Sequence, residues 1–583
     1  MWGWFRTRVA DHTLLLAVIA GLTLPNLGGP SLWDVDEGVN AEAAREMQEA
    51  GTWVIPTFNF ELRTAKPVMI YWLQRMSYAA FGVTNEWTAR FPSVLAGWLT
   101  VLLTYELARR QFGRPTGLLA GIVLASAAEF CALAHAATPD ATLLLFTVLT
   151  YFVFWVGHEN GGRGWWIPTA VACGLAVLTK GPVGVALPGL VVVLYFAWNR
   201  ELRRLLDWRL GAGLLAGALV AGPWYALVAS ETRGAWVKDF FLNENVNRAL
   251  TPMENHRGPI FYHASALLAL FAPWSVFIGG VLWYGVKACR RSTPVLDSGN
   301  HQEEPFSHKS DAVATAEPLH PLPNGLVDPH PYRFLLCWFS AYLVFFSIVS
   351  TKLPNYILPL YPALAILTAR FLVRWREGEL QMPRWLMQGA IGGMFVIAVV
   401  VGVGLLVAGG VIGGLPAKAR VFPGVERWAV LGVIPLIGAG LMAWRLRAGS
   451  RSGVVTVMAA TAVVFVGLLA AFPPGEWDRY KAPRELVRQT GVDNPGRDVR
   501  LAGFDWFQPS VVFYARREVV KLSSPDKAAE FLAVPTEGYL FVPEPTWRKW
   551  IQDKVAVPYH EAGRHFDFYR NCDVLVIANG AGR

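Results

Sequence analysis

Charged residues are scarce in this sequence. Only 16% of its 583 residues are charged and 54% are apolar, whereas charged residues make up about 25% of a typical soluble domain. Such a composition argues against a soluble globular protein. It predicts a chain that lies largely in lipid.

Cysteine is also rare, with five residues in the chain. They are scattered over apolar runs, one basic helix end and the tail: Cys131, Cys173, Cys337, Cys289 and Cys572. Neither a zinc-binding spacing nor a disulfide framework can be built from these positions. We therefore expect a fold without disulfide cross-links.

The basic residues show where the chain lies. A formal net charge of +9 could by itself indicate nucleic-acid binding. The basic residues cluster, however, at the ends of apolar runs, at 109–114, 200–204, 287–291, 374–376 and 445–451. This is the positive-inside pattern of a membrane protein, so we expect a lipid bilayer and no nucleic acid as partner.

About thirteen apolar segments are long enough to cross a bilayer. They lie near 11–28, 87–108, 115–134, 141–157, 165–179, 183–198, 209–229, 260–286, 333–350, 356–373, 386–410, 427–444 and 453–472. If Arg6 and Arg8 are cytoplasmic, each basic cluster falls at a cytoplasmic helix end, and the odd number of spans places 473–583 outside. The first run lacks a small-residue cleavage site and is interpreted as a retained signal anchor.

The remaining segments suggest two domains. Residues 1–472 are predicted to form a transmembrane domain whose first external loop, 29–86, carries interfacial helices at 41–50 and 67–81. A second external loop is expected at 230–259. Residues 473–583 are predicted to form a small external α/β domain, with strands at 499–502, 511–514, 538–542 and 574–577.

One further segment, 292–332, is predicted to be a disordered cytoplasmic loop. It is rich in proline, serine and acidic residues and contains His301, His308, His320 and His330. The irregular spacing of these histidines favours disorder over a metal site.

Polar residues gather at four predicted membrane boundaries. These stretches are Trp33–Glu37, Thr138–Asp140, Thr179–Pro182 and Thr351–Tyr356, and all four map to the external side. Ionisable groups beside hydrocarbon are costly and commonly functional, so their convergence predicts one site. Structural alternatives stay open: Asp36 and Glu37 could cap the helix at 41–50, and Lys180 and Lys352 could extend to the interface.

A series of short motifs runs in order along residues 10–375. They are Asp36–Met47, Gly51–Pro56, Lys66–Trp72, Phe81-Gly82 with Glu86, Ala89–Pro92, Thr179–Pro182, Gly222–Tyr225, His256 with Pro259 and Tyr262, Pro273-Trp274, and Lys352–Pro359. In this combination the chain resembles the superfamily of protein O-mannosyltransferases and lipid A aminoarabinose transferases. The resemblance implies a GT-C fold, mainly α, with about 13 transmembrane helices and a C-terminal periplasmic α/β domain.

The resemblance also implies an activity. The chain would move a sugar, with inversion, from a polyprenyl (undecaprenyl) phosphate to an envelope acceptor. The implied catalytic residues are Asp36 as base, Glu37 and Asp140. The residues implied to bind the donor phosphate or sugar are Lys66, Tyr71, Lys180, Lys352 and Tyr356. No cofactor is required, although a structural divalent metal is possible at His256.

Some positions depart from the family pattern. Aminoarabinose transferases usually carry Arg-Tyr where this chain has Val39-Asn40, and the acidic residue that precedes their lysine is Ala65 here. The first change leaves the aminoarabinose substrate in doubt. The second favours a loop histidine over a metal ligand at His256.

Two other classes of function are alternatives for a multi-pass membrane protein. A multi-pass lipid or glycan transporter or flippase predicts internal repeats and polar residues near the middle of the bilayer, and the sequence shows neither. An assembly protein that acts through its tail predicts a binding motif there, and none is evident. We therefore expect a glycosyltransferase of the bacterial inner membrane with a periplasmic active site. The sequence leaves open the sugar and whether the acceptor is lipid A, another glycan or a protein.

The topology can be tested by cysteine labelling. Ser310→Cys in the 292–332 loop and Ser523→Cys in the tail should be labelled from opposite sides of sealed membrane vesicles. Labelling of both positions from the same side would contradict the predicted arrangement.

Overall fold

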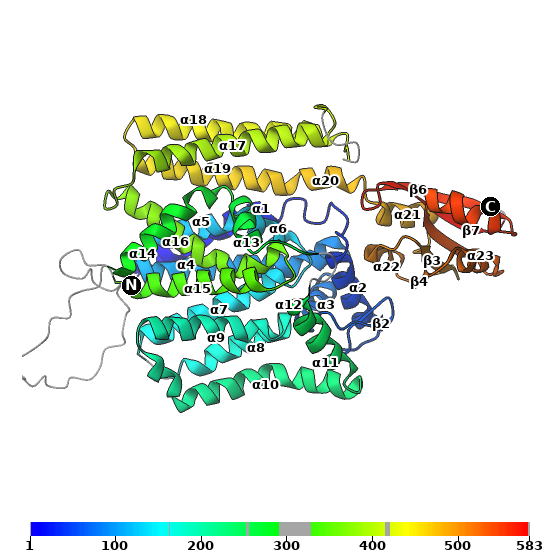
Figure 1. The fold of residues 1–583 in the computed structure, drawn as a ribbon, viewed down its shortest axis with the longest axis horizontal. Helices are drawn as coiled ribbons and strands as arrows, with labels where there is room; N and C mark the ends of the chain where they lie inside the picture. The colour runs from blue at the N-terminus through cyan, green and yellow to red at the C-terminus, as the bar shows by residue number, and fades with distance from the viewer. Residues whose placement is uncertain (1, 162–163, 252–255, 291–327, 414–419, 581–583) are drawn as a thin grey trace, which may run out of the picture.

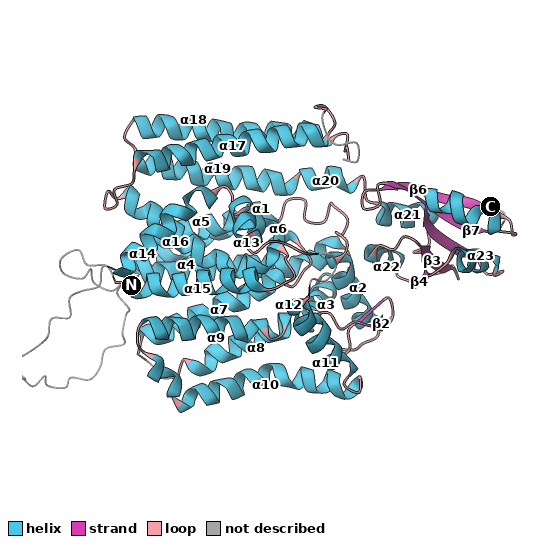
Figure 2. Cartoon of the chain, in the orientation of Figure 1, coloured by secondary structure: helices cyan, strands magenta, loops and turns pink. Residues whose placement is uncertain are grey.

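The computed structural model describes the whole chain except residues 1, 162–163, 252–255, 291–327, 414–419 and 581–583. A bundle of roughly parallel helices forms one part, and a smaller domain with a β-sheet sits at one end of it (Figure 1). The N-terminus lies at the opposite end of the bundle from that domain (Figure 1). The fold is mainly helical, as predicted (Figure 2).

The long helices of the bundle are α1 (Trp2–Thr23), α4 (Glu86–Phe112), α5 (Arg114–Ala125), α6 (Ala128–His135), α7 (Asp140–Glu159), α8 (Trp166–Lys180), α9 (Val183–Trp198), α10 (Trp208–Glu231), α13 (Tyr262–Leu270), α14 (Ile278–Arg290), α15 (His330–Ile348), α16 (Tyr361–Arg376), α17 (Arg384–Ala408), α18 (Val433–Arg447) and α19 (Arg451–Ala471). Short helical segments are η1 (Leu202–Leu206), α11 (Ala235–Asp239), η2 (Phe240–Asn247), α12 (Arg248–Leu250), η3 (Trp274–Phe277), η4 (Pro354–Leu360), η5 (Val425–Gly432) and α20 (Pro473–Asp478).

Eight helices of the described chain are long and apolar enough to cross a membrane, or ten if two bent pairs each count as one span. The pairs are α5 with α6, bent by 63°, and α13 with η3–α14, bent by 119°. The other predicted spans fall on α1, α8 and α9, and α8 and α9 are shorter apolar helices. A multi-pass membrane protein is thus supported, and the count of thirteen stays a prediction.

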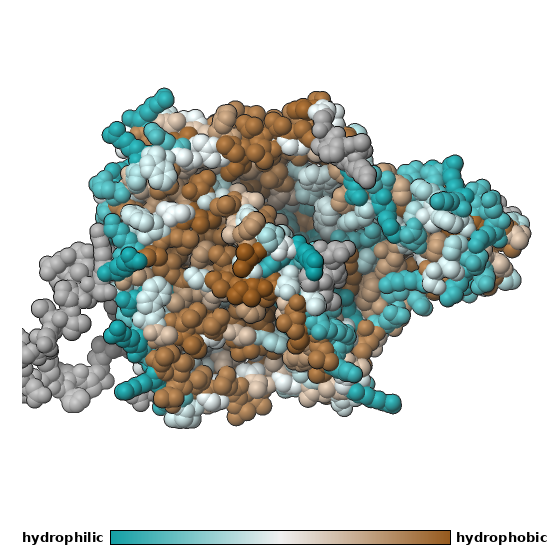
Figure 3. Space-filling view, viewed as in Figure 1, coloured by the Kyte–Doolittle hydropathy of each residue, from teal (hydrophilic) through white to brown (hydrophobic). Residues whose placement is uncertain are grey.

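The surface of the bundle agrees with burial in lipid. A broad apolar band covers the helices, and hydrophilic side chains gather at both ends and over the C-terminal domain (Figure 3). α17, with its neighbours α18 and η5, lies along one side of the bundle, and α8 with α9 and α10 lies along the other (Figure 1). The main core lies between these layers, around α15 and α16.

The first loop is packed inside the protein, and its predicted place at the membrane interface stays a prediction. It contains α2 (Asp36–Glu49), the hairpin β1 (Thr57–Phe58) and β2 (Glu61–Leu62), and α3 (Met69–Phe81). α2 is buried from Glu37 to Met47 on all its faces, because it packs against α3 on one side and against the C-terminal domain on the other. An amphipathic pattern shows that a helix has two unlike faces, but not that the polar one meets solvent.

The C-terminal domain is an α/β domain, as predicted. Its mixed five-stranded sheet has the order β4-β3-β5-β7-β6, with parallel neighbours β4, β3 and β5 and antiparallel neighbours β5, β7 and β6. Its elements are α21 (Ala482–Thr490), β3 (Arg500–Phe504), α22 (Pro509–Ala515), β4 (Val519–Leu522), α23 (Pro525–Ala533), β5 (Gly538–Pro543), α24 (Glu544–Thr546), η6 (Trp547–Ile551), η7 (Gln552–Lys554), β6 (Tyr559–Asp567) and β7 (Cys572–Asn579).

Two local predictions are wrong. The apolar run 511–514, predicted as a strand, lies in α22, which begins at Pro509 and ends at Ala515, before Arg516 in the left-handed region. His330, predicted to lie in a disordered loop, is the first residue of α15. The other three histidines of that loop lie outside the described residues.

Gly38 allows α2 to approach α22. A Cβ at this position would lie 2.7 Å from the backbone nitrogen of Ser510 and 2.8 Å from Oδ1 of Asp34. Overpacking of this kind costs about 1–3 kcal/mol, which exceeds the gain of about 0.5–1 kcal/mol for alanine over glycine in a helix. We expect Gly38→Ala to lower the unfolding temperature in detergent and to hasten proteolytic release of the C-terminal domain.

The matched control is Gly21→Ala in α1, where an added Cβ meets nothing within 4 Å. It should leave the unfolding temperature unchanged or raise it. Equal unfolding temperatures for the two variants would contradict a tight contact between α2 and α22.

Candidate functional site

A cavity of about 500 Å³ opens at the end of the bundle that carries the C-terminal domain. Its walls come from the start of α7, the turn between α8 and α9, the η2–α12 segment, the end of α15 and the start of η4. The polar lining residues are Lys66, Asp140, Thr147, Lys180, Glu244, Asn245, Arg248, Asn355 and Tyr356. Four predicted site residues therefore meet here: Lys66, Asp140, Lys180 and Tyr356.

Asp140 lies at the centre of one polar group. The Lys180 ammonium lies 2.6 Å from its Oδ1, and the Asn355 amide donates to the same oxygen at 3.0 Å. These residues come from α7, α8 and η4. The chain turns after Lys180 at Gly181, whose φ of +75° and whose closeness to the Phe240 ring both require glycine. The carboxylate of Asp140 therefore links the ends of three helices through its bonds to Lys180 and Asn355.

A second ion pair lies on the η2–α12 segment. Arg248 contacts Glu244 at 3.2 Å, one helical turn away, and its guanidinium donates to the Tyr356 hydroxyl at 3.4 Å. The sequence by itself indicates no individual role for Glu244, Arg248 or Asn355. The spacing of four residues between Glu244 and Arg248 could have indicated the pair, but it does not show that the pair faces a cavity.

Lys66 differs from the other two cations of the cavity wall, Lys180 and Arg248. No ion pair of its ammonium group is found among the described residues, and burial is the largest influence on it. Burial, with the nearby charges of Lys180 and Arg248, lowers the pKa of Lys66 to about 8, while the carboxylate of Asp36 acts in the opposite direction. Lys66 is therefore a cation whose charge an added anion would stabilise.

The rest of the cavity wall is apolar. It is formed mainly by aliphatic and aromatic side chains, among them Leu143, Val183, Leu187, Phe240, Leu250, Tyr342, Phe345, Phe346 and Leu358. The cavity therefore combines charged groups with an apolar surface that could hold a hydrocarbon chain.

Asp36 is the first residue of α2 and is exposed to solvent. It is not part of the cavity wall, but its charge reaches Lys66. No hydrogen bond to its carboxylate is found within the described part of the chain. The side chain is thus available to a molecule that enters beside Lys66.

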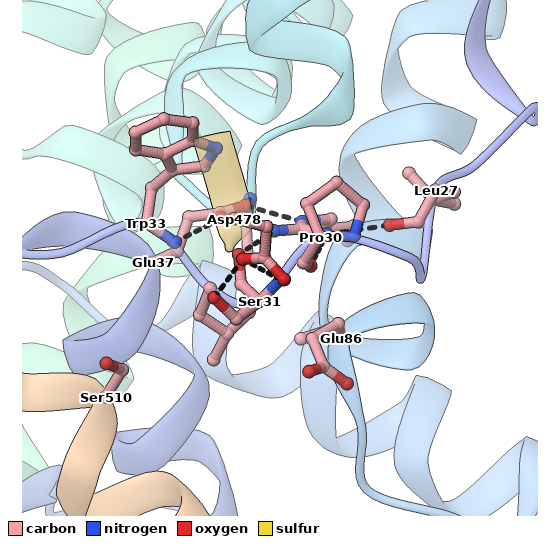
Figure 4. A network of polar contacts seen from close by, with 12 residues as sticks. Leu27, Pro30, Ser31, Trp33, Glu37, Glu86, Asp478 and Ser510 are labelled. Carbon is pink, nitrogen blue, oxygen red and sulfur yellow. Dashed lines mark hydrogen bonds and ion pairs between the residues drawn. The ribbon is translucent and has the colours of Figure 1, made fainter. Parts of the chain in front are cut away.

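Glu37, the next residue, has a different environment. Arg90 of α4 donates to both carboxylate oxygens, with Nε at 2.9 Å and NH2 at 2.8 Å (Figure 4). The backbone amides of Ala137 and Trp33 donate at 2.7 and 2.8 Å. Burial raises the pKa of Glu37, but Arg90 and these amides outweigh it and hold the pKa below its usual value. The pair is buried and fully bonded, so we interpret Glu37 as structural and not catalytic.

Three other predicted residues lie outside the cavity wall. Tyr71 is buried and accepts a hydrogen bond from Arg63 at 2.8 Å. The Lys352 ammonium donates to the carbonyls of Phe346 and Ser347, at 3.0 and 2.6 Å, and so caps the end of α15. His256 accepts through its backbone carbonyl from the Lys352 amide at 3.0 Å. Among the described residues, no group of three or more histidine, cysteine or acidic side chains is arranged to hold a metal, and a structural metal at His256 stays a prediction.

The buried pair can be tested through stability. Glu37→Gln leaves the Arg90 charge buried without its partner, and such a change costs about 3–5 kcal/mol. We expect a clear fall in unfolding temperature in detergent. Asp36→Asn, at an exposed residue whose carboxylate has no hydrogen bond within the described chain, should unfold at the parental temperature. A Glu37→Gln variant as stable as the parent would contradict the structural role.

The sequence matches a known protein family and is similar to several known proteins. Residues 65–225 match the family described as dolichyl-phosphate-mannose-protein mannosyltransferase. The chain is 28% identical, over 72% of its length and 70% of the relative's, to the undecaprenyl phosphate-alpha-4-amino-4-deoxy-L-arabinose arabinosyl transferase of Erwinia tasmaniensis. It is 32% identical to a protein of Aquifex aeolicus over 62% of this chain and 63% of that protein, so it spans less than two thirds of that relative.

Solved structures share the fold. ArnT from Cupriavidus metallidurans bound to undecaprenyl phosphate superposes with a TM-score of 0.76 at 24% identity, over 100% of this chain and 98% of that one. The archaeal oligosaccharyltransferase AglB from Archaeoglobus fulgidus gives 0.51 at 10% identity, over 95% and 72%. These matches confirm the resemblance drawn from the motifs: the chain has the GT-C fold of the ArnT and protein mannosyltransferase type.

Proposed function

We propose that the protein is a membrane glycosyltransferase that moves a sugar from an undecaprenyl phosphate carrier to an envelope acceptor such as lipid A, another glycan or a protein. The observation that carries the proposal is the cavity, which joins an apolar wall to a cluster of cations. The arabinosyl transferase relatives and the ArnT fold support the same activity. The site would face the periplasm of a bacterial inner membrane.

The cavity suits a lipid phosphate for two reasons. Its apolar surface can hold the first isoprene units of a carrier, and Lys66, Lys180 and Arg248 can stand around a phosphate. Lys180 and Arg248 already have acidic partners. Lys66 has none in the described chain, so it gains most from an anion and is the first candidate to contact the phosphate.

The transfer itself needs one base and charge stabilisation. As the acceptor oxygen bonds to the anomeric carbon, that carbon's bond to the phosphate oxygen breaks, and the acceptor proton passes to Asp36. The departing lipid phosphate keeps the electron pair, and its growing negative charge is stabilised by Lys66 and its neighbours. Inversion requires no covalent intermediate and therefore no nucleophilic side chain. The proposed step requires no cofactor.

Asp140 would have a positioning role. Lys180 and Asn355 already bond its Oδ1, so the carboxylate is held in place before a substrate enters. A fixed acceptor group in the cavity wall can orient the hydroxyls of the donor sugar.

Asp36→Asn separates catalysis from packing. Asparagine has nearly the same shape as aspartate but cannot take a proton, and loss of a general base costs about two to four orders of magnitude in rate. We expect Asp36→Asn to bind undecaprenyl phosphate as the parent does, yet to transfer sugar at least about 100-fold more slowly. Transfer is measured by mass spectrometry of the acceptor, with donor binding measured in parallel.

The competing interpretation is that Asp36 only caps α2. Asparagine caps about as well as aspartate, so transfer would then be unchanged. A transporter or flippase would consume no donor, and the parent would then move the lipid-linked sugar intact. Unchanged transfer by Asp36→Asn would overturn the assignment of Asp36 as base, and movement of the intact lipid-linked sugar would overturn the proposed glycosyl transfer.

A further inference from the structure

A second hollow adjoins the donor cavity. It is lined by Arg257, Gly258, Ile260, Ser347, Ile348, Val349, Ser350 and Lys352, and its volume is about 630 Å³. Val349 belongs to the walls of both spaces. We propose that this hollow binds the phosphate-bearing headgroup of a lipid acceptor, while the first cavity holds the donor; the assignment rests on the proposed function.

Two cations face this hollow. Lys352 was expected at the donor phosphate, but its side chain lies in the wall of the second hollow and not of the donor cavity. Its ammonium group carries three N–H donors, and two of them bond the Phe346 and Ser347 carbonyls. The third donor has no partner within the described part of the chain and can serve a ligand, and those two bonds fix the position of the group.

Arg257 is the second cation. It is exposed, and no hydrogen bond or ion pair of its guanidinium is found within the described residues. A guanidinium can bond a phosphate through two parallel N–H groups. Among the described residues, no aspartate or glutamate lines the hollow, in contrast to the donor cavity, where two acidic residues are present. The hollow therefore favours an anion.

The rim of the hollow indicates that the anion is part of a lipid. Ile348 is 71% exposed and Ile260 is 69% exposed, and their neighbours Phe261 and Leu250 are similarly open. Large apolar side chains that are this exposed, beside the end of a membrane-spanning helix, fit acyl chains better than water. A free phosphate has no apolar group that could contact these side chains.

The backbone keeps the hollow next to the donor cavity. The segment around Thr351 is hydrogen-bonded to the α12 segment, through Ser350 to the Ala249 carbonyl at 3.0 Å and through the Thr351 hydroxyl to the Arg248 carbonyl at 2.7 Å. Arg248 faces the donor cavity, whereas Lys352 faces the second hollow. Two lipid phosphates could therefore bind side by side at one end of the bundle, as transfer between two lipids requires.

The test uses the full-length protein in detergent and three probes: bisphosphorylated lipid A, phosphatidylglycerol and inorganic phosphate. We expect lipid A to bind at least about tenfold more tightly than either of the others, a difference of about 1.4 kcal/mol in binding free energy. Arg257→Gln should weaken lipid A binding by about tenfold and leave undecaprenyl phosphate binding unchanged. In transfer assays it should raise KM for the lipid acceptor and leave kcat unchanged.

The matched control is Arg233→Gln, an exposed arginine in the turn after α10 that lines neither space. It should behave as the parent. Parental lipid A binding by Arg257→Gln, equal binding of phosphatidylglycerol, or equal binding of inorganic phosphate would each overturn the proposal. Loss of undecaprenyl phosphate binding in Arg257→Gln would assign the hollow to the donor. Because binding is measured without transfer, a parent that binds lipid A but transfers no sugar would refute the proposed function and not this site.

Discussion

The buried ion pair between Glu37 and Arg90 is the interaction on which the rest of the site depends. Arg90 bonds both oxygens of Glu37 and also donates to the carbonyls of Leu27, Pro30 and Ser31 (Figure 4). One guanidinium on α4 thus fixes the whole segment that leads from α1 into α2. Because breaking a buried pair leaves an uncompensated charge, this segment has one favoured position against the bundle.

The same segment is also hydrogen-bonded to the C-terminal part of the chain. Asp478 accepts from the backbone amide of Ser31 at 2.8 Å, and Lys481 donates to the Ser31 carbonyl at 2.7 Å. Further along, Asp34 accepts from the amide and the hydroxyl of Ser510 at 2.8 and 2.5 Å. The first loop is therefore an ordered layer between two domains, and Asp36 is held at its edge by bonds that its neighbours make.

Charge pairing then distinguishes the cations of the donor cavity. Lys180 and Arg248 lie beside carboxylates that offset the cost of their partial burial, whereas the acidic group found to act on Lys66 within the described residues is the more distant Asp36. A site arranged in this way is incomplete until an anion enters, because a cation in a poorly solvated place is stabilised by a negative ligand more than by water. The second hollow repeats this arrangement with Arg257 and Lys352.

The sequence by itself determined the membrane class, the mainly helical fold, the α/β tail and the residues from which the site would be drawn, because apolar length, charge position and motif order are local properties. Only the tertiary structure separated Asp36 from Glu37: adjacent helical residues point about 100° apart, and the packing around α2 decided which one was buried. It likewise brought Arg248 and Asn355 to the cavity and placed Lys352 beside Arg257. A long side chain beside a turn can point in more than one direction. Its direction depends on the partners that distant segments supply, and no spacing in the sequence encodes those partners.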